Sequence, residues 1–221
     1  MKYFNKEFFT FFDGLKKNNN KEWFDKNRST YEQEVKLPFR QLVEDITAKM
    51  TKDLPELNQN ISKAIFRINR DIRFAKDKSP YKTNVGAILS RTGTKDQIYP
   101  GFYMHFGAED CIVGGGKYFC EKEELKKIRQ EIYYNNKGFA KLLQGKAFKE
   151  HYKTLQGDRS KVLELDYKSF ANEQPLIANK QFWYYANVSR KDIMGDKIDT
   201  LVLQHFKAGI PLNRFLMEAI S

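Results

Sequence analysis

The feature that most constrains the fold is a run of short alternating segments between residues 62 and 113. Apolar side chains occur there at every second position, as in Phe102, Met104 and Phe106, which is typical of a β-strand with one buried face. The pattern predicts four strands, at 62–69, 85–90, 102–106 and from 111 onward. No connection reads as a helical crossover, which parallel strands would need, so the sheet should be antiparallel.

Helical periodicity dominates the first fifty residues. Apolar residues recur at helical spacing at Phe8, Phe11, Phe12 and Leu15. The next helix is expected to begin at Asn19, whose side chain would cap it together with Glu22 three residues later. Pro38 would kink or restart that helix, because proline cannot donate a backbone hydrogen bond.

Beyond the sheet, Gly114–Gly116 is expected to form a turn or bulge through which the chain leaves it. Helices are predicted over 121–150, and aromatic residues predict a strand over 181–188. The tail from Asp196 suggests two helices broken at Gly209-Ile210-Pro211. The simplest organisation is a single α+β domain, a mainly antiparallel sheet flanked by N-terminal and C-terminal helices. Its parts would be helical 1–55, sheet and motif 62–119, helices 121–150 and a mixed part 155–221.

Composition narrows the class of protein further. The 221 residues are 41% hydrophobic and 30% charged, which excludes a disordered chain. No stretch approaches the roughly 20 apolar residues that cross a bilayer, and no signal peptide is evident at the start, so we expect no membrane association. Two cysteines make no disulfide framework and fit no zinc spacing, which favours a cytoplasmic, reducing location.

The net charge of +11 is concentrated in one segment. Seven cations and two anions lie between Lys63 and Lys82, a net charge of +5. The cations include Arg67, Arg70 and Arg73, and the guanidinium group offers a planar fork of donors that suits carboxylate and phosphate oxygens. The segment therefore predicts either an anion-binding pocket or a network of Arg–Asp pairs that fixes an irregular loop to the sheet.

The same segment carries a resemblance. It matches the pattern Arg-x-x-Arg-Asp-x-Arg-Phe-x-x-Asp/Asn-Lys-x-x-Tyr at every fixed position, namely Arg67, Arg70, Asp71, Arg73, Phe74, Asp77, Lys78 and Tyr81. The chain thus resembles a bacterial family catalogued as domain of unknown function 2461. Similarity extends over roughly residues 4–150 and includes Asn19-Asn20-Lys21-Glu22-Trp23-Phe24, Gly101-Phe102-Tyr103-Met104-His105 and Gly114-Gly115-Gly116-Lys117-Tyr118. The resemblance implies no established activity, cofactor or catalytic residue.

Two further residues join the candidate site. Tyr103 and His105 lie on one face of a predicted strand and would form a polar patch if that face met Arg67 and Asn69. The alternative is a half-exposed sheet face with a hydrogen-bonded histidine. No metal site is predicted, because His151 and His205 have no partner ligands at a metal-binding spacing. Cys111 could act as a nucleophile only beside a base that the sequence does not reveal.

Three functions follow from these patterns. The first is binding of a small phosphorylated or carboxylated ligand, with Asp71 orienting an arginine and the ligand held by Arg67, Arg70, Arg73, Lys78, Tyr81, Tyr103 and His105. The second is nucleic-acid binding, suggested by the positive charge and by aromatic residues near cations. The third is a structural or interaction module in which the motif only stabilises the fold. The sequence does not decide whether the protein is an enzyme, and it indicates no cofactor.

Overall fold

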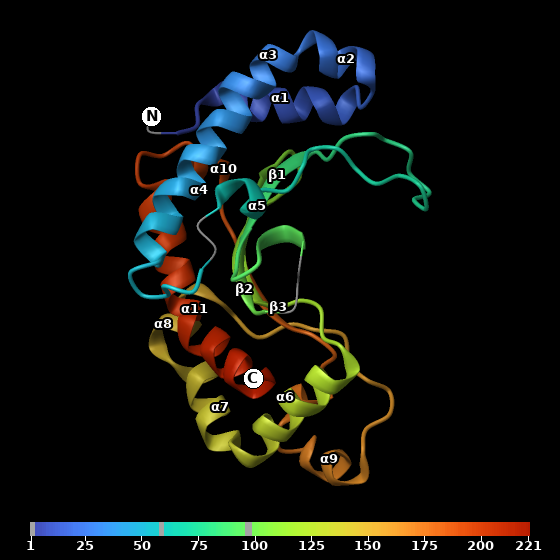
Figure 1. Ribbon diagram of the computed structural model, residues 1–221, viewed down its shortest axis with the longest axis vertical. Coiled ribbons are helices and arrows are strands. Elements are labelled where there is room, and N and C mark those ends of the chain that lie inside the picture. Colours follow the sequence, from blue (N-terminus) through green and yellow to red (C-terminus); the bar gives the residue numbers. More distant parts are fainter. Residues whose placement is uncertain (1–2, 58–59, 96–98) are drawn as a thin grey trace. The chain divides into compact units, whose positions relative to one another are not determined.

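The computed structural model describes residues 3–57, 60–95 and 99–221, and it is α+β (Figure 1). Four strands form one antiparallel sheet in the order β1-β2-β3-β4, with bounds Asn84–Leu89, Gly101–Gly107, Cys111–Lys117 and Phe182–Asn187. The sheet and its flanking helices confirm the expected fold class. None of the described helices is long and apolar enough to cross a membrane.

The chain divides into two compact units. Unit 1 comprises residues 1–95, 103–113 and 187–204, and unit 2 comprises 96–102, 114–186 and 205–221. The expectation of one domain stays a prediction. Unit 1 contains α1 (Lys6–Lys17), α2 (Lys21–Lys26), α3 (Arg28–Thr30), the π-helical turn η1 (Tyr31–Lys36), α4 (Leu37–Met50), α5 (Ile61–Ala64), β1, the 3-10 turn η2 (Gly93–Lys95) and α10 (Arg190–Ile193).

Unit 2 is mainly helical. It contains α6 (Lys122–Tyr134), α7 (Asn136–Gln144), α8 (Lys146–His151), α9 (Leu165–Phe170), the 3-10 turn η3 (Pro175–Ala178) and almost all of β4. The strands β2 and β3 and the helix α11 (Ile198–Ile220) each continue from one unit into the other.

The core of unit 1 is aromatic. The ring of Phe106 on β2 meets the rings of Phe4 and Phe39 edge-on, with both centroid distances at 5.8 Å. Phe8 and Phe12 on α1 are fully buried beside them, as the helical spacing predicted. Such edge-to-face contacts add roughly 0.5–1.5 kcal/mol per pair to the stabilisation from burial.

Three predicted elements differ in the structure. Residues 62–69 do not form a strand, because the side chain of Asn60 accepts a hydrogen bond from the N–H of Ser62 and starts the short helix α5. The chain that follows pairs with the sheet only at isolated bridges, Ile65 with Ala87 and Asn69 with Tyr81.

The glycine triplet is part of β3 and does not lead out of the sheet. Gly116 has a φ of +105°, and a Cβ there would lie 2.2 Å from the carbonyl oxygen of Phe182 on the neighbouring strand. Glycine is therefore required by both the backbone conformation and the close approach of β4. The triplet serves strand packing, so the prediction that the chain turns out of the sheet at Gly114–Gly116 was wrong.

The tail forms one continuous helix, α11, with Pro211 inside it. Proline in a helix interior removes one backbone hydrogen bond, so the predicted break was physically reasonable. The helix continues because its buried residues pack into the core of unit 2, among them Ala208, Leu212, Phe215 and Leu216. Gly209 also lets the helix approach Tyr184, whose hydroxyl donates to the Gly209 carbonyl at 3.3 Å.

Candidate functional site

The motif closes into a loop, residues 69–81, which we call the motif loop. Its two ends pair like a hairpin: Asn69 bridges Tyr81, the N–H of Arg70 donates to the Pro80 carbonyl, and the N–H of Lys82 donates to the Ile68 carbonyl. Figure 1 shows this segment, in teal between α5 and β1, as a long loop that leads away from β1. The candidate residues on the loop are consequently held by a closed base.

Asp71 and Arg73 form one ion pair within the motif loop. The Arg73 side chain donates from Nε to Asp71 Oδ1 at 3.0 Å and from an Nη to Asp71 Oδ2 at 2.7 Å, and the backbone N–H of Arg73 also donates to Asp71. These bonds, the side-chain ones first, lower the pKa of Asp71 to about 2. Both side chains are exposed, so this pair shapes the loop more than it stabilises the protein.

A second set of bonds centres on Asp77. Its carboxylate accepts from the hydroxyl of Ser79 at 2.7 Å, from the N–H of Ser79 at 2.9 Å, and from the guanidinium of Arg70. The bonds from Ser79, followed by the bond from Arg70, lower the pKa of Asp77. Lys78 Nζ donates to the Ile72 carbonyl at 3.0 Å. Four predicted ligand-binding residues, Arg70, Asp71, Arg73 and Lys78, therefore have partners inside the loop.

Tyr81 anchors the loop to the N-terminal helices. It is 7% exposed, and its ring stacks on Phe24 with centroids 4.1 Å apart and planes 15° apart. The side chain of Asn19 donates to the Tyr81 carbonyl at 2.9 Å and accepts from the Tyr81 N–H at 3.1 Å. Asn19 does not cap α2 as predicted; Asn20 does, accepting from the N–H of Trp23. The cap moves by one residue because Asn19 already serves Tyr81.

Arg67 and Lys82 differ from the other cations of the segment. Neither side chain has a hydrogen-bonding or carboxylate partner among the described residues, although Lys82 Nζ lies 5.0 Å from the centre of the Phe66 ring. Burial lowers the pKa of Lys82, and the nearby positive charge of Arg67 lowers it further. The segment thus holds two neighbouring cations whose side chains make no ion pair with the described residues, although the positive charge of Arg67 helps to lower the pKa of Asp71.

Lys82 was missing from the predicted site. It is the last of the seven cations in the segment, and nothing in its sequence spacing distinguishes it from Lys76 or Lys78. Its position depends on the closed loop base, which returns the chain from Asn69 to Tyr81 and so places Lys82 opposite Ile68. The proximity of Lys82 to Arg67 follows only from the pairing of the two ends of the thirteen-residue motif loop.

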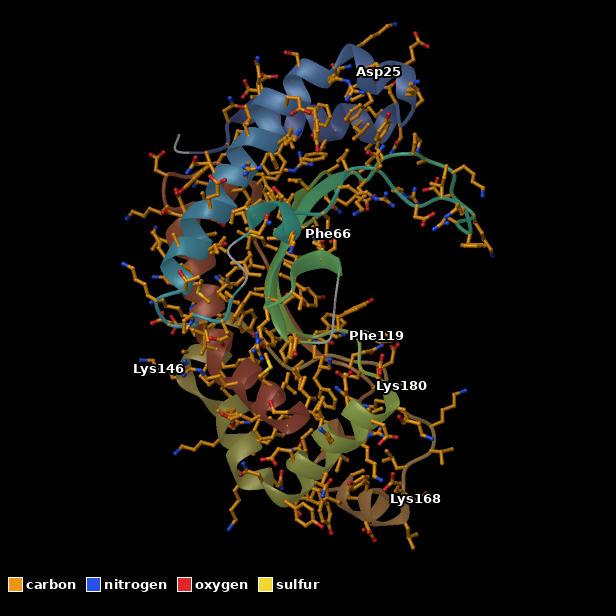
Figure 2. All side chains as sticks on the ribbon, in the orientation of Figure 1. Asp25, Phe66, Phe119, Lys146, Lys168 and Lys180 are labelled. Atoms are coloured by element: carbon orange, nitrogen blue, oxygen red, sulfur yellow. The ribbon has the colours of Figure 1, made fainter. Side chains whose placement is uncertain are left out.

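Tyr103 and His105 do interact with each other on β2. The Tyr103 hydroxyl lies 3.0 Å from Nδ1 of His105, and Nε2 of the same ring lies 2.7 Å from the carboxylate of Asp110. A carboxylate can only accept a hydrogen bond, so Nε2–H donates to Asp110, and in the tautomer protonated at Nε2 the atom Nδ1 accepts from the tyrosine hydroxyl. The ring of Phe66, which Figure 2 labels, stands edge-on to Tyr103 at 6.2 Å, so Phe66 brings the motif segment to this strand.

Two other kinds of site would require a metal-binding group or a reactive cysteine among the described residues. Within residues 3–57, 60–95 and 99–221, no group of three or more His, Cys, Asp or Glu side chains is placed to hold a metal ion. The rings of His151 and His205 do meet, with centroids 4.5 Å apart, but they are two groups only. Burial raises the pKa of the Cys111 thiol, and it raises that of Cys120 to about 11, so both thiols are protonated near neutral pH.

Comparison with known proteins gives a family. Neither the comparison with curated proteins nor the comparison with solved structures found a match. One family model, described as conserved hypothetical protein (DUF2461), matches residues 7–215. The match spans α1 except for its first residue, the complete motif loop, all four strands and most of α11. The chain therefore belongs to the DUF2461 family of conserved hypothetical proteins.

Proposed function

We propose that unit 1 binds a small phosphorylated or carboxylated ligand through Arg67 and Lys82. One observation carries the proposal: the side chains of two neighbouring cations, one of them half-buried, make no hydrogen bond or ion pair with the described residues, and the only acid among these whose charge acts on Arg67 is Asp71. Half-buried cations are normally paired with acids, because desolvating an unpaired charge is costly. An anion between these two residues would supply the missing negative charge and remove their repulsion.

The neighbouring residues suit this role. Arg67 is exposed and can offer a two-pronged set of donors, while Lys82 contributes a point charge from a less hydrated position against Phe66. Asp71 and Asp77, the acids of the segment, already bond to Arg73, Arg70 and Ser79. Their negative charges are thereby partly neutralised, which favours an anion at the loop base.

Tyr103, His105 and Asp110 extend the proposal. Asp110 and His105 fix the direction of the Tyr103 hydroxyl, and Phe66 joins Tyr103 to the segment that carries Arg67. The single hydroxyl hydrogen of Tyr103 is already donated to His105. We therefore expect Tyr103 to position Phe66 beside the cations through its ring, and Tyr103→Phe, which keeps the ring, should weaken ligand binding less than Arg67→Ala does.

The test uses inorganic pyrophosphate and citrate as probes, measured by calorimetry and by thermal unfolding. Arg67→Ala and Lys82→Ala should each weaken binding of the better probe about tenfold, with unfolding temperatures in buffer equal to or above that of the wild type because repulsion is relieved. Lys76→Ala is the matched control, an exposed lysine of the motif loop, and should bind normally. Equal binding by all four proteins, or no binding by the wild type, would refute the proposal.

A second function is favoured by the tip of the motif loop. Phe74 is 95% exposed, and the guanidinium of Arg73 lies 5.9 Å from the centre of its ring. An exposed aromatic ring beside cations can stack on the bases of a single-stranded nucleic acid. Binding of a fluorescent oligonucleotide should then weaken steeply with salt and should weaken further in Phe74→Ala. Salt-independent binding, or a Phe74→Ala variant that binds normally, would eliminate this function.

A further inference from the structure

A hollow of about 570 Å³ lies in unit 2, between α7, α8 and α11. Its walls are apolar and come from all three helices, with Leu142 on α7, Phe148 on α8, and Leu212 and Phe215 on α11. This volume falls in the range of sites that hold small organic ligands. The hollow is independent of the cations of unit 1, and the proposed function leaves it without a role.

Small residues create the hollow. Gly138, Gly145, Ala147 and Ala208 line it, and their small size leaves the space between the helices open. Gly145 also ends α7 and immediately precedes α8, so the two helices diverge there without a side chain between them. The hollow opens to solvent beside exposed residues, and an apolar ligand that entered it would make contacts that its apolar walls now lack.

Two lysines give the hollow a charged edge. Lys141 on α7 and Lys146 on α8 both line it, and Figure 2 labels Lys146 on its helix. Both are exposed, and neither has an ionic or hydrogen-bonding partner in the part of the chain that the structure describes. The apolar wall together with these two positively charged lysines complements a molecule that has an apolar tail and a negatively charged head group.

We infer that the hollow binds a fatty acid, with its acyl chain against the accessible apolar side chains of Leu142, Ala147 and Pro211 and its carboxylate at Lys141 and Lys146. A free inorganic anion would leave the apolar wall unused, and a neutral hydrocarbon would leave the two lysines unused. The amphipathic anion is the ligand class that uses both. Binding of the tail gives affinity by removing apolar surface from water, and the lysines select the charged head.

Calorimetry with decanoate and decanol separates the two contributions. The full-length wild type should bind one decanoate per chain, and the double variant Lys141→Ala/Lys146→Ala should bind it about tenfold more weakly. The same variant should bind decanol within twofold of the wild type, because the alcohol has no charge. The matched control Lys137→Ala/Lys149→Ala removes two exposed lysines of the same helices that do not line the hollow, and it should leave both ligands unaffected.

A third variant tests the location. Ala147 is exposed and lines the hollow, so Ala147→Trp should occupy the space without disturbing the core, and its unfolding temperature in buffer should match that of the wild type. It should abolish binding of both decanoate and decanol. The inference is overturned if the wild type shows no saturable binding, if Ala147→Trp binds normally, or if the two lysine double variants lose equal affinity for decanoate.

Discussion

Replacement of Asn19 by alanine tests how the motif loop is held. Asn19 makes two hydrogen bonds to the backbone of Tyr81, which is nearly buried. Each bond contributes about 0.5–1.5 kcal/mol, and alanine also leaves the Tyr81 N–H and carbonyl without partners. Asn19→Ala should therefore lower the free energy of unfolding by about 2 kcal/mol. For a chain of this length, that loss corresponds to a fall in unfolding temperature of roughly 4–8 °C.

The free energy of unfolding is measured by urea unfolding at neutral pH, and two further variants serve as comparisons. Asn18→Ala removes one exposed bond, from Asn18 to the Gly14 carbonyl, and should cost less than about 0.5 kcal/mol. Asn19→Asp keeps the acceptor for the Tyr81 N–H but loses the donor, so it should lie between Asn19→Ala and the wild type. If Asn19→Ala is no less stable than Asn18→Ala, the two bonds do not anchor the loop and the reasoning fails.

Two further predictions concern pH and strand packing. The pKa of Asp71 in the folded chain, about 2, lies below its ordinary value of 3.8, so the pair with Arg73 is complete above about pH 4 and is lost as the pH falls toward 2. An NMR titration should show the Arg73 amide shift changing with a midpoint near pH 2, and a midpoint near 3.8 would contradict the ion pair. Gly116→Ala should destabilise the protein by about 3 kcal/mol or more in urea unfolding, because alanine is strained at positive φ and would clash with β4. Gly145→Ala, at a φ of −55°, is its control and should cost less than about 1 kcal/mol.

The strands and helices whose apolar residues follow a regular spacing were predictable from the sequence. Alternation located β1, β2 and the start of β3, and the helical stripes located α1 and α6. These patterns succeed because each records which side of an element is buried. They fail where a contact with a residue far away in the sequence determines the local structure. Asn19 has the chemistry of a helix cap, but Tyr81, sixty-two residues away, takes its side chain.

The candidate site was predictable only in part. The cluster of arginines indicated the segment, and the structure places Arg70, Asp71, Arg73 and Lys78 within one loop, where they bond to one another or to the loop backbone. The sequence could not separate cations that bond inside the loop from cations that remain unpaired. That distinction depends on how the loop closes, and closure brings Lys82 to Arg67 while it gives Arg70 and Arg73 their own acids.

The division of the chain into two interleaved units has a consequence for its synthesis. Unit 1 includes residues 187–204, which contribute the buried side chains of Ile193 and Val202, and unit 2 begins before unit 1 is complete. A ribosome adds roughly 5–20 residues per second, so a nascent chain exposes the unfinished core of unit 1 until residues 187–204 have been added. Neither unit can be obtained by simple truncation, and a stop codon shortly before residue 187 would deprive both units of essential segments.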